Sequence, residues 1–194
     1  FPQGTMMAFE GCINSETFET DFFEFDLRLT KDEKLLILHD DILDEVSNAV
    51  EYFGITNVYP EDYTYDELYN LNMGEYFKNA DGEMPYNGLR GDDIPDNLRV
   101  LTAEDALTYV ESCGEYYYSI EIKCSGESGI RAADILYDIL AEKNVIDRTV
   151  VASFDKKTLE HLDKNYPDLI RIAYNVEVFG LYLDSLFDIE RPEN

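Results

Sequence analysis

The stretch FFEFDLRLTKDEKLLILHDD, residues 22–41, has the pattern of two strands joined by a tight turn. The segment 22–30 carries Glu24 and Asp26 among apolar and aromatic residues, and the segment 35–40 is a short apolar run that includes His39. A parallel pair of strands needs a crossover of about a dozen residues or more, so this short connection predicts an antiparallel hairpin.

The turn determines which side chains of this hairpin face each other. If residues 32–33 form a two-residue turn, Asp26 lies opposite His39 and Glu24 lies opposite Asp41. Opposed side chains project from the same face with Cβ atoms about 5 Å apart, so two carboxylates and an imidazole converge in this register. Asp-Glu is a poorer two-residue turn than Asp-Gly, and a slip of one residue moves His39 to the other face.

The composition is that of a globular domain with a strongly acidic surface. The chain has 194 residues, of which 45% are hydrophobic, and this is enough for one sizeable core. The formal net charge of −27 repels nucleic acid and anionic membrane surfaces, so we expect neither as a partner.

The sequence contains no apparent membrane segment, disulfide framework or zinc signature. No stretch approaches the roughly 18 apolar residues of a membrane span, and no signal peptide is visible. The three cysteines are widely spaced and include no C-x-x-C pair. This favours the interpretation that they are small buried apolar side chains. Because the chain starts at Phe1, the possibility of an upstream targeting or anchoring segment stays open. A cytoplasmic and an extracytoplasmic location are both compatible with the sequence.

Strands and helices alternate in the second half of the chain. Strands are predicted near 116–124, 149–154 and 169–174, with helices near 102–113, 128–144, 155–166 and 175–187. This alternation predicts βαβ units and a parallel sheet.

Residues 41–100 lack this regularity and are predicted to form an insertion. A helix is predicted from a capping box at Thr64 and Glu67 to Gly74. The Gly-, Pro-, Asn- and Asp-rich stretch that follows is typical of a long functional loop or a small subdomain.

The strand near 116–124 carries an acidic and a basic residue at its carboxyl end. With a period of two, Glu121 and Lys123 share one face, and both are costly to bury unpaired. Catalytic groups of βα-barrels collect at this end of the strands. An ion pair between Glu121 and Lys123, or with neighbours, explains the same pattern, and both interpretations stay open.

Three carboxylates of the two segments form a set of hard oxygen ligands. Glu24, Asp26 and Glu121 suit Mg²⁺ or Ca²⁺ better than zinc. A divalent ion at the mouth of a barrel neutralises and polarises a phosphate.

Two further side chains extend this chemistry. Lys123 adds a point charge toward the same phosphate, and His39 is a candidate general acid or base near neutral pH. The other histidine, His161, lies in a predicted helix and is expected to be a surface or packing residue.

The combination of E-x-D, H-D after a tight hairpin, and E-x-K on a later strand resembles the glycerophosphodiester phosphodiesterase family. The resemblance covers nearly the whole chain and is carried by FEFDLRLTKDEKLLILHDDIL (23–43), TYDELYNLNMGEYF (64–77) and SIEIK (119–123). It implies a single α/β domain over residues 1–194, a TIM-type (β/α)8 barrel that is incomplete as given, with the insertion at about 41–100 after the early hairpin.

The resemblance also implies an activity and its residues. The family hydrolyses glycerophosphodiesters to glycerol 3-phosphate and an alcohol with a divalent cation, Ca²⁺ or Mg²⁺, in lipid and glycerol metabolism. Glu24, Asp26 and Glu121 match the metal-ligand positions, His39 matches a catalytic histidine, and Lys123 matches a contact to the substrate phosphate.

The chain departs from the family pattern at its ends. The family has a second catalytic histidine in an H-R-G strand ahead of a P-E-N-T segment, and here that segment is Pro2-Gln3-Gly4-Thr5 with nothing before Phe1. No final barrel strands are apparent after Phe187. We therefore expect an internal portion of a longer protein that binds a divalent ion but hydrolyses glycerophosphocholine poorly, since losing a general acid or base costs about 10²–10⁴ in rate.

Two other functions stay open. One is a catalytically silent barrel module that binds metal or phosphate, and the other is a related hydrolase acting on phospholipid headgroups. The headgroup, the metal and the oligomeric state are not determined by the sequence.

Overall fold

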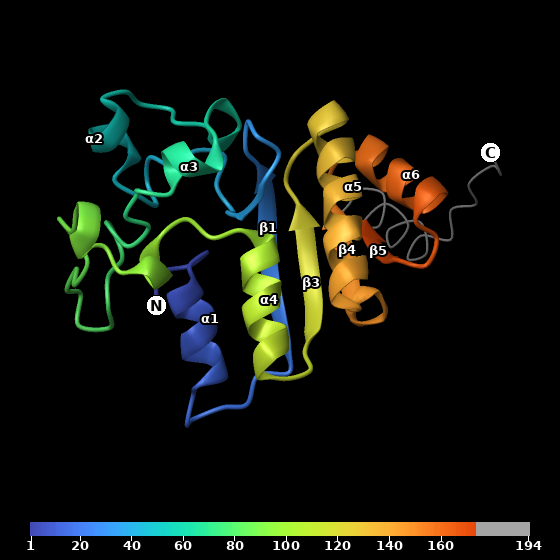
Figure 1. The fold of residues 1–194 in the computed structure, drawn as a ribbon, viewed down its shortest axis with the longest axis horizontal. Coiled ribbons are helices and arrows are strands. Elements are labelled where there is room, and N and C mark those ends of the chain that lie inside the picture. The colour runs from blue at the N-terminus through green and yellow to red at the C-terminus, as the bar shows by residue number, and fades with distance from the viewer. Residues whose placement is uncertain (174–194) are drawn as a thin grey trace, which may run out of the picture.

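The computed structural model describes residues 1–173, which form one five-stranded sheet with helices packed against it (Figure 1). The strand order is β2-β1-β3-β4-β5, with β2 antiparallel to β1 and all other neighbours parallel. The strands are β1 (Phe22–Leu29), β2 (Leu35–Ile37), β3 (Tyr117–Ile122), β4 (Thr149–Ser153) and β5 (Ile170–Ala173). The predicted antiparallel hairpin and parallel second half are both confirmed.

Helices alternate with the parallel strands, as the sequence predicts. The α-helices are α1 (Met6–Ile13), α2 (Ala49–Phe53), α3 (Tyr65–Leu68), α4 (Ala103–Cys113), α5 (Gly126–Lys143) and α6 (Lys156–Asn165). Short 3-10 helices are η1 (Pro60–Asp62), η2 (Gly91–Asp93), η3 (Asp96–Leu98) and η4 (Ile146–Arg148). The predicted helix at 175–187 and any later strands lie outside the described residues.

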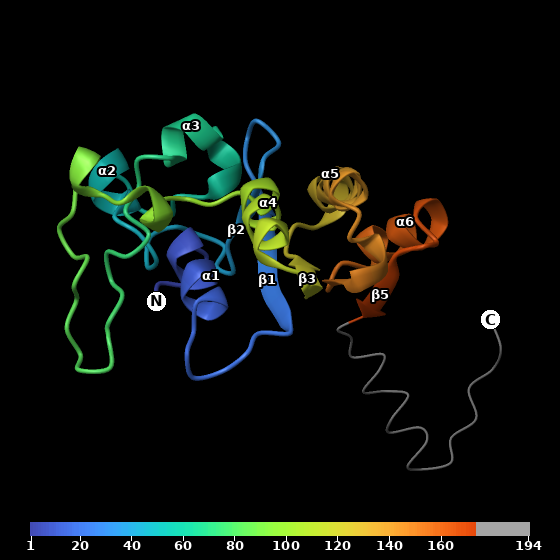
Figure 2. The same ribbon diagram turned by 60° about the horizontal axis from the view of Figure 1, so that its bottom comes forward.

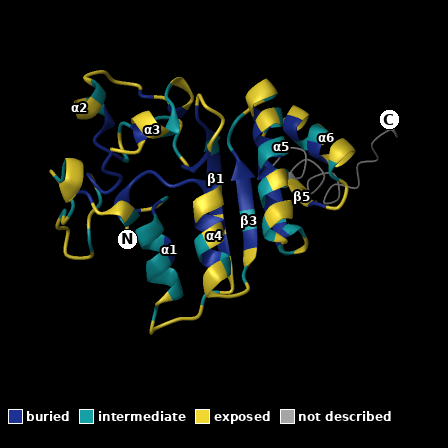
Figure 3. Ribbon diagram, viewed as in Figure 1, coloured by how far each residue is buried: buried dark blue, intermediate teal, exposed yellow. Residues whose placement is uncertain are grey.

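The two faces of the sheet are chemically different. Figures 1 and 2 show α4, α5 and α6 along one face, and Figure 3 shows that the sides of these helices turned away from the sheet are exposed. On β1 the side chains of Phe23, Phe25 and Leu27 belong to the main apolar core with these helices. The alternate residues Glu24 and Asp26 therefore project from the opposite face.

The hairpin register differs by one residue from the predicted one. The ladder pairs Leu27 with Ile37 and Leu29 with Leu35, so a three-residue loop, 31–33, replaces the two-residue turn. Glu33 closes this loop in the left-handed region, with φ of 61°. A three-residue hairpin loop commonly ends in such a residue.

The change of register alters the partner of Asp26. Leu38 lies beside it and donates its backbone N–H to the Asp26 carbonyl oxygen at 2.9 Å. The predicted pairs Asp26–His39 and Glu24–Asp41 are therefore wrong. Any approach of His39 to the carboxylates depends on the irregular chain after β2.

The insertion packs on the outer part of the hairpin through a second apolar cluster. Its buried members are Leu36, Leu38, Leu43, Ala49, Val58, Leu68, Leu71, Met73 and Val100. The capping box at Thr64 and Glu67 is present, but α3 ends at Leu68 and not at Gly74. Beyond the helix, the Asn72 N–H donates to the Asn48 side chain at 2.8 Å, and the Asn72 side chain accepts from the Gly74 N–H and donates to the Tyr86 carbonyl oxygen.

A buried carboxylate, Glu75, ties the loops of the insertion together. Its side chain is 8% exposed and lies 2.7 Å from Nη1 of Arg90, which also pairs with Glu51. The amides of Asn72 and Asn87 each donate to Glu75 at 3.0 Å. Arg90 is thus the countercharge of a carboxylate that is largely removed from water.

We expect Arg90→Met to destabilise the chain by about 2–4 kcal/mol, because it leaves the Glu75 carboxylate buried without its countercharge. Urea unfolding followed by circular dichroism measures this. Arg131→Met is the matched control, since Arg131 and its partner Glu33 are both half exposed and water screens such a pair, so its loss should have little effect on stability. Equal effects of the two substitutions would contradict this role of Glu75.

Candidate active site

The candidate site lies at the carboxyl ends of β1 and β3. The parallel ladder sets Asp26 directly opposite Glu121 and Glu24 opposite Ser119. All of these side chains project from the face that α4, α5 and α6 do not cover, because their neighbours along each strand are core residues. The three predicted ligand carboxylates therefore occupy adjacent positions on two strands.

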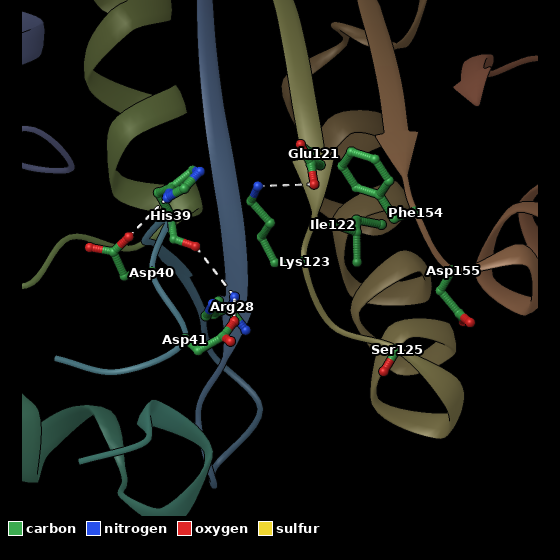
Figure 4. Close-up of a pocket in the computed structure, with 10 residues that line it drawn as sticks. All are labelled: Arg28, His39, Asp40, Asp41, Glu121, Ile122, Lys123, Ser125, Phe154 and Asp155. Atoms are coloured by element: carbon green, nitrogen blue, oxygen red, sulfur yellow. Dashed lines mark hydrogen bonds and ion pairs between the residues drawn. The ribbon is translucent and has the colours of Figure 1, made fainter. Parts of the chain in front are cut away.

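Lys123 forms an ion pair with carboxylates of both strands. Its Nζ lies 3.2 Å from Oδ1 of Asp26 and 3.1 Å from Oε1 of Glu121, and all three side chains are at most 16% exposed. Figure 4 shows the ammonium group reaching from the end of β3 to the Glu121 carboxylate. The Glu121–Lys123 ion pair expected as one interpretation of the sequence is thus present, with Asp26 as a second partner.

The electrostatics of the cluster follow from this arrangement. Burial alone would lower the pKa of Lys123, but Glu121 and Asp26 outweigh it and raise that pKa. Partial burial, followed by the negative charges of Asp26 and Glu121, raises the pKa of Glu24. The carboxylates therefore repel one another, and positive charge among them is stabilising.

His39 follows β2 at the junction of two cavities. A cavity of about 220 Å³ is lined by Glu24, Asp26 and His39, and one of about 490 Å³ by His39, Glu121 and Lys123. The structure thus gathers all five predicted residues around two adjoining cavities, although not through the predicted strand pairing. His39 Nδ1 lies 2.9 Å from Oδ1 of Asp40.

Arg28 is a site residue that the sequence reasoning did not single out. It donates to the His39 carbonyl oxygen at 3.3 Å, pairs with Asp41, and lines the larger cavity (Figure 4). Its side chain is 12% exposed. The sequence feature that predicts this position is the two-residue period of β1, because it places Arg28 on the same face as Glu24 and Asp26.

The donor set fits a divalent cation, although not in the arrangement seen here. Within residues 1–173, no three Asp, Glu, His or Cys side chains are grouped closely enough to hold a metal ion as they stand. Oε1 of Glu121 is nevertheless buried and, in the described part of the chain, receives no hydrogen bond, since Lys123 approaches it outside hydrogen-bonding geometry. A buried carboxylate oxygen of this kind is suited to a hard cation.

Comparison with known proteins decides the family. The model of the glycerophosphoryl diester phosphodiesterase family matches residues 1–181. The chain belongs to this family. It is 26% identical over 173 residues to a glycerophosphodiester phosphodiesterase of Bacillus subtilis, covering 87% of the chain and 53% of that protein. It is 27% identical over 189 residues to one from Bacillus altitudinis, covering 96% of the chain and 67% of that protein.

Solved structures of the family show the fold. The chain matches the glycerophosphodiester phosphodiesterase of Agrobacterium tumefaciens with a TM-score of 0.64 and 17% identity, over 88% of the chain and 60% of that structure. It matches a phosphodiesterase of Oleispira antarctica, solved with the product sn-glycerol-3-phosphate, with a TM-score of 0.68 and 16% identity, over 94% of the chain and 67% of that structure. The chain thus spans between 53% and 67% of these relatives.

The fold class predicted from the sequence, an α/β fold of the TIM-barrel type, is confirmed by these likenesses. Within residues 1–173, β1, β3, β4 and β5 lie side by side in chain order and run parallel, as in a barrel segment, whereas β2 pairs antiparallel at the edge of the open sheet. None of the helices in this part of the chain has the length and apolar character needed to cross a membrane.

Asp155 connects the loop after β4 with the loop after β3, at the carboxyl end of the sheet. Its carboxylate caps α6 by accepting from Thr158 N at 3.1 Å, and it accepts the Gly126 N–H at 3.0 Å from the start of α5. Burial opposes its charged form, but the hydrogen bonds from Thr158 and Gly126 outweigh burial and lower the pKa of Asp155 below the ordinary 3.8.

We expect Asp155→Asn to cost about 0.5–1 kcal/mol of stability at pH 7 and less at pH 3. A carboxyl whose pKa is lower in the folded chain contributes its full stability above the unfolded-state value, near 3.8, and loses it as the pH falls through the folded-state pKa. Urea unfolding at both pH values measures the difference. Asp138→Asn, on the exposed side of α5, is the control. A cost of Asp155→Asn that is the same at pH 7 and pH 3 would contradict the role of its charge.

Proposed function

We propose that this chain is the core of a phosphoric diester hydrolase that cleaves glycerophosphodiesters to glycerol 3-phosphate and an alcohol, in lipid and glycerol metabolism. The observation that carries the proposal is the cluster of Asp26, Glu121 and Lys123 across two adjacent barrel strands, with Glu24 and His39 beside it. Family membership and the names of the relatives support this reaction.

Glu24, Asp26 and Glu121 would hold a divalent cation, for which Ca²⁺ and Mg²⁺ are the candidates. The bound ion would supply positive charge that neutralises the phosphate of the substrate. The three carboxylates are hard oxygen donors, and the buried Glu121 oxygen without a hydrogen bond supports their role as ligands.

Lys123 and His39 would act on the substrate directly. Lys123 lines the larger cavity and would bind a phosphate oxygen there. His39 would take the proton from the oxygen nucleophile that attacks phosphorus, or give a proton to the alcohol oxygen that leaves as the P–O bond breaks. With the Nδ1 of His39 engaged by Asp40, Nε2 is the nitrogen left for that transfer.

The insertion at about 41–100, within a single domain, would contribute to substrate choice. Val46 and Met73 come from it and line the smaller cavity beside Glu24 and His39. Comparison of hydrolysis rates for the choline, ethanolamine and inositol glycerophosphodiesters would identify the preferred alcohol.

A catalytically silent module that binds metal or phosphate is the second candidate. The observation that favours it is that the chain has two histidines, and only His39 is at this site. His161 bridges two helices instead, with Nε2 2.6 Å from Oδ1 of Asp134.

We expect His39→Ala to lower the rate of glycerol 3-phosphate release from glycerophosphocholine by about 10²–10⁴, because it removes the proton-transfer group. The release is measured with calcium present, by a coupled dehydrogenase assay with excess protein so that slow hydrolysis is still recorded. His161→Asn also removes an imidazole and leaves the rate unchanged.

Three outcomes separate the candidates. Chelation of the cation should abolish release by the unsubstituted chain. An undiminished rate in His39→Ala would contradict its catalytic role. Calcium binding by an unsubstituted chain that releases no glycerol 3-phosphate would favour the silent module.

A further inference from the structure

The ammonium group of Lys123 lies between Asp26 and Glu121, two of the three proposed cation ligands. We propose that Lys123 is a tethered counter-ion, which neutralises the two carboxylates without metal and is displaced by the incoming cation toward the phosphate cavity. This rests on the proposed function, because it assumes that these carboxylates hold the cation.

The strand pairing makes a counter-ion necessary. Asp26 and Glu121 are direct partners in the β1–β3 ladder, and like charges opposite each other on adjacent strands are destabilising. Their side chains are 13% and 10% exposed, so water screens this repulsion poorly. Lys123 lies 3.2 Å and 3.1 Å from their oxygens and offsets it.

The pairing of Lys123 with Glu121 leaves one carboxylate oxygen without a well-oriented hydrogen bond. Oε1 of Glu121 is ion-paired with Lys123 but accepts no hydrogen bond within the described chain. The backbone of Lys123 is fixed, because its N–H donates to the Leu27 carbonyl oxygen at 3.0 Å. A change at the site is therefore expected in the flexible side chain of Lys123, and the strands stay in place.

Displacement would couple the two ligands of the site. While Lys123 pairs with both carboxylates, its charge is neutralised and is not available to a phosphate. A cation that takes over the carboxylates would release the ammonium group into the larger cavity, which Lys123 already lines. Cation binding would then increase affinity for a phosphate ligand, and phosphate would increase affinity for the cation by the same factor.

The test is the calcium affinity of the 194-residue chain, measured by isothermal titration calorimetry at physiological salt, with no phosphate present. We expect Lys123→Met and Lys123→Gln to bind Ca²⁺ at least about tenfold more tightly than the unsubstituted chain, because the competing charge is gone. Lys164→Met removes the same charge from the exposed end of α6 and should bind like the unsubstituted chain, since salt screens remote charges beyond about 8 Å.

Thermal unfolding gives a second measurement that does not depend on the calorimetry. Without calcium, both Lys123 variants should melt below the unsubstituted chain, because Asp26 and Glu121 lose their counter-ion. Saturating calcium should raise Tm more in the variants than in the unsubstituted chain. Lys123→Gln keeps a hydrogen-bond donor, so the same measurements can be made on it if Lys123→Met does not fold.

The outcomes distinguish this inference from the proposed function. Calcium affinity that is the same in the unsubstituted chain and in both Lys123 variants would overturn the counter-ion role while leaving the cation site in place. Failure of all variants to bind Ca²⁺ or Mg²⁺ would overturn the cation site and this inference with it.

Discussion

The parallel pairing of β1 with β3 is the constraint on which the site depends. It sets Asp26 against Glu121 at the carboxyl end of the sheet, with both side chains nearly buried. Two carboxylates in this position require a positive charge, and Lys123 supplies it from the end of β3. The core side chains that alternate with them hold α4, α5 and α6 on the other face.

The position of His39 depends on a different set of contacts. It lies two residues after Ile37, the last paired residue of β2, so the ladder does not fix it. Arg28 instead holds the chain at this point by donating to the His39 carbonyl oxygen and pairing with Asp41. The candidate proton-transfer group thus lies on a short irregular segment, whereas the carboxylates lie on rigid strands. Catalytic residues often lie on loops that a rigid scaffold positions.

Much of this arrangement was predictable from the sequence, because it follows from the short repeat of side-chain directions along a strand and from the alternation of strands and helices. The two-residue alternation set Glu24 with Asp26 and Glu121 with Lys123, and the alternation of strands and helices predicted the parallel sheet. The hairpin register was not predictable, since it depends on a left-handed backbone at Glu33, which non-glycine residues rarely adopt. The residue opposite Asp26 was therefore misassigned by one position. The contact of Lys123 with Asp26 joins segments far apart in the sequence, so only the folded sheet reveals it.

The most direct test of the account is a crystal structure of the chain grown with calcium, with the ion located by anomalous scattering. We predict one ion coordinated by oxygens of Glu24, Asp26 and Glu121 at about 2.3–2.6 Å, with the Lys123 ammonium withdrawn from both carboxylates. An ion bound elsewhere, with Lys123 still between Asp26 and Glu121, would contradict it.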